Sequence, residues 1–248
     1  MVLDEIIKQK KIEIESLPDF NIDDLPRSQK NFISAIKEKN KAIIAELKAK
    51  SPSEGTICYN YDPVAIAQEY ETGGVAAISV LTDQNFFAGS FSDLYKVSQS
   101  SSVPLLCKDF IIDKKQLYQA RQHGADACLL IVRVLSDEQL KELNQVIEKL
   151  GMVSLVEIFD EADLQRALKI SPKMIGINNR CLNTLVMDLG NAERLKPLIP
   201  KSILTLSLSG AKTPEAASEI AHKFDAVLMG TSLMRSDSRI EFIQNILI

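Results

Sequence analysis

Lysine and glutamate side chains stand near the ends of three short apolar segments of this sequence. Glu46 and Lys48 lie in the first of these segments, Lys108 in the second and Glu157 in the third. Charged side chains are seldom buried without a partner. A positioned ammonium group can protonate a carbonyl or hydroxyl oxygen, and a positioned carboxylate can accept a proton. Together these four residues predict acid–base chemistry.

Each of these side chains also has a structural explanation. Lys48 could form a salt bridge with Glu46, and Lys108 could extend its ammonium group to solvent. Glu157 could accept a hydrogen bond from the backbone of a neighbouring strand. The functional interpretation is favoured because several segment ends carry such groups, and a purely structural fold gains little from concentrating the cost of desolvating charges in one place.

Three more polar residues belong to the same pattern. Ser51 follows the first segment, while Asn178 and Arg180 close another one. The two-residue period of an extended strand places Asn178 and Arg180 on a common face, as it does Glu46 and Lys48. We therefore expect all of these side chains to converge on one site.

Glycines at the ends of the last two apolar segments suggest a phosphate site. Ser209 and Gly210 end one segment, and Gly230 and Thr231 end the other. Glycine lets the backbone approach a ligand closely, and backbone N–H groups can bind a phosphate dianion. The alternative is that these glycines only form turns. We favour a phosphorylated small-molecule substrate, with no metal and no redox cofactor.

Two phenylalanines could enclose the ring of a flat substrate. Phe110 lies two residues after Lys108, and Phe87 lies in a predicted loop. Aromatic residues at such positions are more often core or lid residues. Near the charged residues they could instead form walls of the site.

Apolar segments and helical segments alternate along most of the chain. Near-continuous apolar content is typical of parallel strands covered on both faces. Eight strand–helix units predict a closed (β/α)8 TIM barrel, whose chemistry lies where strands end. A doubly wound open sheet is the alternative, but it normally has fewer strands and a glycine-rich first turn. The eight predicted strands are 42–48, 76–82, 104–110, 127–134, 153–159, 173–179, 203–209 and 226–230.

The N-terminal residues precede this pattern. The pattern of residues 1–41 predicts one or two helices and a polar linker with two prolines. We therefore expect a single barrel domain over 1–248, with 1–41 as an N-terminal helical extension. The N-terminus mixes charged and apolar residues, unlike a signal peptide. No apolar run reaches about 18 residues, so no membrane span is expected.

The composition narrows the possible partners. A net charge of −4 argues against general affinity for nucleic acid. Four scattered cysteines and two histidines form no zinc-binding or disulfide pattern. We expect a cytoplasmic monomer that binds neither nucleic acid nor membranes.

Several longer motifs resemble those of indole-3-glycerol phosphate synthases, and the resemblance runs from the N-terminal helices to the last strand. The motifs are IIAELKAKSPSEG, LTDQNFFAGS, LLCKDFIID, LLIV, LVEIFDEADLQRAL, IGINNRCLNTLVMDL, SGAKTPE and MGTSLMR. The resemblance implies a carboxy-lyase of tryptophan biosynthesis. Its substrate would be 1-(2-carboxyphenylamino)-1-deoxyribulose 5-phosphate, and its products indole-3-glycerol phosphate, carbon dioxide and water.

The resemblance also implies roles for individual residues. Lys108 of the KDF motif would be the general acid, and Glu157 of the LVE motif the base in the dehydration. The other matching positions fall into a catalytic set and a substrate-binding set. They are Glu46, Lys48 and Asn178 for catalysis, and Ser51, Phe87, Phe110, Leu129, Arg180, Ser209, Gly210, Gly230 and Thr231 for substrate binding.

The chain departs from the family pattern at two positions. Leu208 stands where the family usually has a glutamate, and Cys58 stands where it usually has a basic residue. Leu208 leaves open a second interpretation, a weakened or non-catalytic paralogue that binds a phosphorylated ligand. A third interpretation, an isomerase acting on phosphoribosylanthranilate, would lack the ExK, KDF and LVE motifs.

Overall fold

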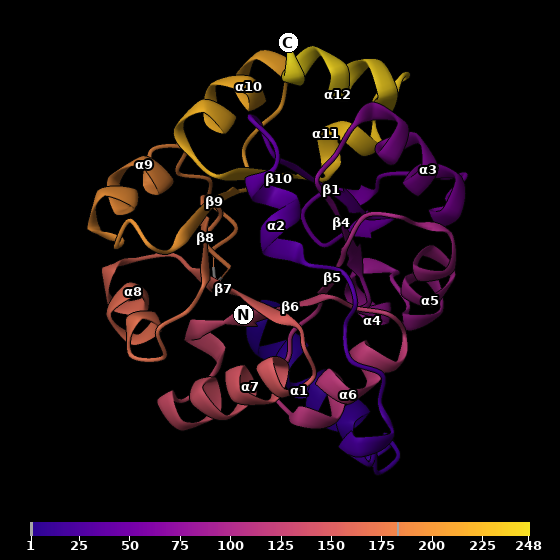
Figure 1. Cartoon of the computed structure of the whole chain (residues 1–248), viewed down its shortest axis with the longest axis vertical. Helices are drawn as coiled ribbons and strands as arrows, with labels where there is room; N and C mark the ends of the chain where they lie inside the picture. The colour runs from indigo at the N-terminus through magenta and orange to yellow at the C-terminus, as the bar shows by residue number, and fades with distance from the viewer. Residues whose placement is uncertain (1, 183) are drawn as a thin grey trace.

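The computed structural model describes residues 2–182 and 184–248, and eight parallel strands within them close into a barrel (Figure 1). Neighbouring strands around the barrel follow the order β1-β10-β9-β8-β7-β6-β5-β4. The predicted (β/α)8 barrel and all eight predicted strands are confirmed. The strands are β1 (Ile43–Leu47), β4 (Ala77–Leu81), β5 (Leu105–Lys108), β6 (Ala127–Ile131), β7 (Val153–Ile158), β8 (Met174–Asn178), β9 (Leu204–Leu208) and β10 (Ala226–Met229).

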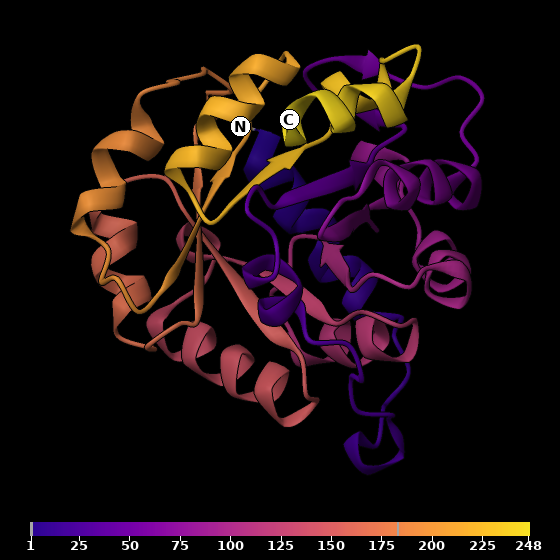
Figure 2. The ribbon, with the colours of Figure 1, turned by 45° about the horizontal axis from the view of Figure 1, so that its top comes forward.

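Helices surround the strands in both views of the ribbon (Figures 1 and 2). Most of them lie between successive barrel strands, as the sequence predicts. They are α3 (Pro63–Gly73), α4 (Gln84–Phe87), α5 (Phe91–Ser100), α6 (Lys114–Gln122), α7 (Asp137–Lys149), α8 (Glu161–Leu168), α9 (Asn191–Leu195), α10 (Pro214–Lys223), α11 (Thr231–Met234) and α12 (Arg239–Leu247), with short 3₁₀ turns at Val132–Val134 and Lys196–Leu198.

Capping residues set the limits of these helices. Ser136 and Gln139 form the predicted capping box at the start of α7, and Gly151 follows its end with a φ of +75°. Thr213 caps α10, and Pro214 occupies its first turn. The apolar stripe of α7 is buried, so it packs this helix against the barrel.

The N-terminal helices cover the two ends of the barrel. Phe32 and Ile36 of α2 (Phe32–Lys37) pack in one cluster with the first residues of the strands, and Figure 1 shows α2 across the barrel centre. Leu3 and Ile6 of α1 (Val2–Glu15) instead line a cavity at the carboxyl ends of the strands. A 3₁₀ turn at Ile22–Asp24 lies between α1 and α2.

Two small elements in the loops were not predicted. Strands β2 (Lys50–Ser51) and β3 (Gly55–Thr56) form an antiparallel hairpin in the loop after β1, and α11 begins directly after β10. Both border the cavity. Within the described ranges, no helix has the length and apolar content needed to cross a bilayer.

Candidate active site

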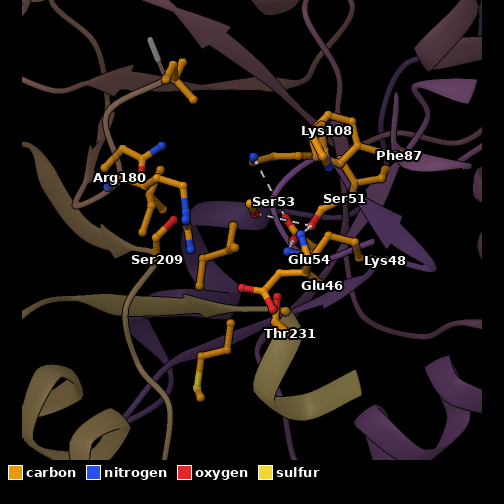
Figure 3. Close-up of a pocket in the computed structure, with 18 of the residues that line it drawn as sticks. Glu46, Lys48, Ser51, Ser53, Glu54, Phe87, Lys108, Arg180, Ser209 and Thr231 are labelled. Atoms are coloured by element: carbon orange, nitrogen blue, oxygen red, sulfur yellow. Dashed lines mark hydrogen bonds and ion pairs between the residues drawn. The ribbon is translucent and has the colours of Figure 1, made fainter. Parts of the chain in front are cut away.

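A cavity of about 750 Å³ opens at the carboxyl ends of the barrel strands (Figure 3). Arg180 and Ser209 lie on one side of it, and Phe87, Lys108 and Lys48 on the other. Every residue that the sequence assigns to the site lines this cavity. They are Glu46, Lys48, Ser51, Phe87, Lys108, Phe110, Leu129, Glu157, Asn178, Arg180, Ser209, Gly210, Gly230 and Thr231.

Glu46 joins the two lysines of the site. Its Oε1 lies 2.9 Å from Lys48 Nζ, and its Oε2 lies 3.9 Å from Lys108 Nζ. Burial alone would raise the pKa of Glu46, but the ammonium groups of Lys48 and Lys108 hold it below its ordinary value. Glu46 is therefore a buried carboxylate that lies between the two lysine side chains of the site.

Glu157 lies on β7 with one oxygen bound and the other unbound. Its Oε1 accepts a hydrogen bond from Asn178 Nδ2 at 3.1 Å, whereas its Oε2 has no hydrogen-bond partner in the described part of the chain. The Arg180 N–H donates to Asn178 Oδ1 at 2.9 Å and so fixes which way the amide faces. A buried oxygen without a partner is costly, which suits a group that binds substrate or accepts a proton.

The aromatic wall is built from two loops. The rings of Phe87 and Phe110 have their centroids 6.1 Å apart with an interplanar angle of 34°. Asp83 accepts hydrogen bonds from the N–H groups of Phe86 and Phe87, and so caps α4. Leu129, which is also buried, adds an apolar surface to the same cavity.

A buried lysine of α1 ties these two loops together. Lys10 Nζ lies 2.9 Å from Asp83 Oδ2 and 2.8 Å from Asp109 Oδ1. Although burial opposes it, the carboxylates of Asp109 and Asp83 raise the pKa of Lys10 above its ordinary value. Asp109 thus pairs with Lys10 rather than with its neighbour Lys108, which leaves Lys108 to Glu46.

The loops after β9 and β10 form the side of the cavity assigned to phosphate. Ser209 and Gly210 have φ angles of +66° and +104°, so the chain turns sharply there. Ser232 Oγ donates to the Ala211 carbonyl at 2.9 Å and joins the two loops. A Cβ added to Gly230 would lie 2.5 Å from Glu46 Oε1, so this glycine also makes room for the buried carboxylate.

Comparison with known proteins matches residues 3–246 to the family model for indole-3-glycerol phosphate synthase. The indole-3-glycerol phosphate synthase of Acetivibrio thermocellus is 44% identical over 255 residues, which cover 98% of each chain. That of Lacticaseibacillus paracasei is 40% identical, over 98% of this chain and 97% of that one. The chain belongs to the indole-3-glycerol phosphate synthase family.

This assignment confirms the resemblance, the expected indole-3-glycerol phosphate synthase function in tryptophan biosynthesis and the class of decarboxylating lyase.

Solved structures with similar folds are more distant in sequence. The tryptophan synthase alpha chain of Legionella pneumophila superposes with a TM-score of 0.63 at 13% identity, covering 89% of this chain and 97% of that one. A 3-hexulose-6-phosphate synthase from Salmonella typhimurium gives 0.66 at 12% identity, over 83% and 96%. These two matches support the barrel fold alone.

Leu208, the departure from the family pattern, lies in the cavity wall. Its side chain is buried, and its Cδ1 is 2.7 Å from where a Cβ on Gly176 would lie. A glutamate at position 208 would be a potential partner for Asn178 and Lys48, and Leu208 cannot take that place. The structure gives Lys48 the carboxylate of Glu46 and gives Asn178 that of Glu157. Neither polar group depends on a glutamate at position 208 for its hydrogen bond.

Several lining residues were not predicted. Leu3 and Ile6 reach the cavity from α1, and Glu54 and Arg235 form an ion pair of 3.0 Å between the loop after β1 and the end of α11. Lys212 also lines the cavity. The sequence predicted a helix in this region, but nothing in it shows which end of the barrel the helix covers.

Proposed function

We propose that this cavity binds 1-(2-carboxyphenylamino)-1-deoxyribulose 5-phosphate and closes its indole ring. The observation that carries the proposal is the arrangement of Glu46, Glu157 and the two lysines around one cavity. Two ammonium groups share the Glu46 carboxylate, and Glu157 offers a buried oxygen that has no partner among the described residues. That is a set of acids and one free base.

Ring closure begins when the aromatic carbon that bears the carboxylate attacks the ketone carbon of the substrate. The Lys108 ammonium donates a proton to the ketone oxygen, which becomes a hydroxyl group. The new carbon–carbon bond is made, and the carbon–carboxylate bond then breaks to release carbon dioxide and restore the aromatic ring. Leu129 and the Phe87–Phe110 wall hold the ring in place.

Dehydration completes the indole. The hydroxyl group formed in the first step leaves as water after a lysine ammonium protonates it, and Glu157 takes the proton that is lost from the substrate. Asn178 holds Glu157 by its Oε1, so its Oε2 is directed to one position. Lys48 lies 2.9 Å from Glu46 and serves as the second lysine of the site.

The remaining residues bind the substrate's charged ends. Ser209, Gly210, Gly230 and Thr231 form the proposed phosphate side, where glycines allow close approach of the backbone. Ser51 and Arg180 complete the lining. A monomeric state and a cytoplasmic location, without nucleic-acid or membrane partners, stay predictions. Gel filtration of the purified protein tests the first of these.

Steady-state kinetics tests the proposal. The purified protein should convert the substrate with the appearance of indole fluorescence, and Glu157→Gln should lower kcat by about 10²-fold or more. Glutamine keeps the shape and the hydrogen bond from Asn178 but cannot accept the proton. A protein that binds substrate without any turnover would instead be the non-catalytic paralogue that Leu208 left open.

A further inference from the structure

The turn after β9 is held in an unfavourable backbone conformation beside the cavity. Ser209 has a φ of +66° and is followed by Gly210 with a φ of +104°. For a residue with a Cβ, such as Ser209, the left-handed region is higher in free energy than the right-handed one. Such a residue stays there only where its surroundings hold it. Since both residues line the cavity, whatever holds this turn also shapes the site.

Asn179 is the residue that holds it. Its Nδ2 donates to the Ser209 carbonyl at 3.0 Å and to Ser207 Oγ at 3.2 Å. Its Oδ1 accepts from the Ala192 N–H, at the start of α9, at 3.0 Å. The amide has only one compatible orientation, because a flipped amide would set its oxygen against a carbonyl and its NH₂ group against an N–H.

Asn179 is also fixed by its own backbone. Its N–H donates to the Leu208 carbonyl at 3.0 Å, and its carbonyl accepts from the Asp188 N–H at 2.8 Å. The side chain is 2% exposed and is not among the residues that line the cavity, unlike its neighbours Asn178 and Arg180. Asn179 therefore acts on the site through the backbone that it binds and not by contact with the cavity.

The hydrogen bond to the Ser209 carbonyl sets the direction of the next N–H. In a trans peptide the carbonyl and the N–H point in opposite directions, and the peptide bonds here are trans. Binding of the Ser209 carbonyl by Asn179 thus turns the Gly210 N–H away from Asn179. Within the described ranges this N–H has no hydrogen-bond acceptor. An unpaired N–H beside the cavity is a suitable donor for an anion.

We infer that Asn179 is a positioning residue that holds the Ser209–Gly210 turn in the shape that binds the phosphate of the substrate. This inference rests on the proposed function, which puts phosphate at this turn. It assigns to Asn179 a task in substrate affinity, separate from the acid–base chemistry of Lys108 and Glu157.

Asn179→Asp is the sharpest test, because it keeps the size of the side chain and the acceptor for Ala192 while it removes both donated hydrogen bonds. We expect KM for the substrate and the inhibition constant of inorganic phosphate both to rise about tenfold, with kcat within about twofold of the parent. Asn144→Asp is the matched control. Asn144 is also buried, and its Oδ1 accepts a hydrogen bond from Ser154 Oγ at 2.6 Å near the opposite end of the barrel, so Asn144→Asp controls for the cost of a buried negative charge while it keeps this acceptor.

Ser209→Gly supplies a second readout, because glycine adopts positive φ without the penalty that serine meets. If Asn179 acts through this turn, the effect of Asn179→Asp on KM should be several-fold smaller in the Ser209→Gly background. Should Asn179→Asp not fold, Asn179→Ala removes the same hydrogen bonds without a negative charge, and the same split is expected.

Three results would overturn the inference. The first is an Asn179→Asp variant that loses stability as Asn144→Asp does but keeps the parent KM. The second is a fall in kcat at unchanged KM, which would place the effect on the neighbouring Asn178. The third is an equal effect of Asn179→Asp in both backgrounds. If inorganic phosphate does not compete with substrate even in the parent, it is the proposed phosphate side that fails.

Discussion

Gly230 offers a direct test of how the buried carboxylate is packed. A Cβ at this position would lie 2.5 Å from Glu46 Oε1, 3.1 Å from Lys48 Nζ and 3.3 Å from Glu46 Cβ. Carbon–oxygen contacts in proteins are about 3.3 Å or longer, so in Gly230→Ala the carboxylate must move by roughly 1 Å. Glu46 is buried and bound to Lys48, so this movement disturbs the ion pair at 2.9 Å.

The expected effect is on the chemical step. A displacement of about 1 Å in a catalytic group can cost about a hundredfold in rate, and we expect Gly230→Ala to lower kcat by about 10- to 100-fold, or about 1.4–2.7 kcal/mol. KM should change less, because one methyl group leaves the Ser209–Gly210 turn in place. Steady-state kinetics with the indole fluorescence of the product measures both constants.

A double-mutant cycle decides whether the effect runs through Glu46. In a Glu46→Ala background the carboxylate that an added Cβ would meet at 2.5 Å is gone, so Gly230→Ala should have a much smaller further effect on kcat. A variant whose KM rises while kcat is retained would refute this reasoning. Gly230 would then serve only to let the backbone approach phosphate, which is the role that its position in the sequence suggested.

Three further predictions concern the charged groups and Leu208. Lys108→Ala should lower kcat by about 10²–10⁴-fold with a smaller change in KM, and near-native turnover in that variant would show that another group is the acid. The parent protein should form indole-3-glycerol phosphate, and Leu208→Glu should raise its kcat/KM by no more than about 100-fold, or about 2.7 kcal/mol, in kinetics at one pH; turnover by the glutamate variant alone would favour a non-catalytic parent. Since the pKa of Glu46 is lowered in the folded protein, its charge contributes stability above the ordinary value of 4.5 that is lost as pH falls through the lowered pKa. Urea unfolding should therefore show the parent more stable than Glu46→Gln at pH 7, with a difference that narrows below pH 4.5; a constant difference would contradict the lowered pKa.

The strands and the residues at their ends could be predicted because both follow from local sequence. A buried parallel strand requires a nearly continuous apolar run in the sequence. The strands Ile43–Leu47 and Met174–Asn178 each lie within such a short run. Once eight such runs imply a closed barrel, their carboxyl ends must meet at one mouth. Lys108 and Glu157 could therefore be placed in one site although 48 positions separate them in the sequence.

The partners of these residues could not be predicted in the same way. Lys108 is followed directly by Asp109, and the sequence offers that carboxylate as its neighbour. The structure gives Asp109 to Lys10 instead, from a helix about 100 residues earlier in the sequence. β5 ends at Lys108, and the Asp109 carboxylate that follows it is bound by Lys10, whereas Lys108 lies near Glu46. Pairing depends on what packs beside each residue in the fold.

The alternation of side chains along a strand explains why Asn178 and Asn179 have different tasks. Both amides are buried at the end of β8, and the two-residue period of the strand predicted that only Asn178 shares a face with Arg180. Asn178 faces the cavity and binds Glu157, whereas Asn179 faces the other way and binds the turn after β9. The Glu157 carboxylate belongs to β7 and the turn follows β9, and these two strands pair with β8 on its two sides. At this strand end Asn178 holds the proposed base and Asn179 holds the proposed phosphate turn. The two amides together therefore set the distance between the base and the turn.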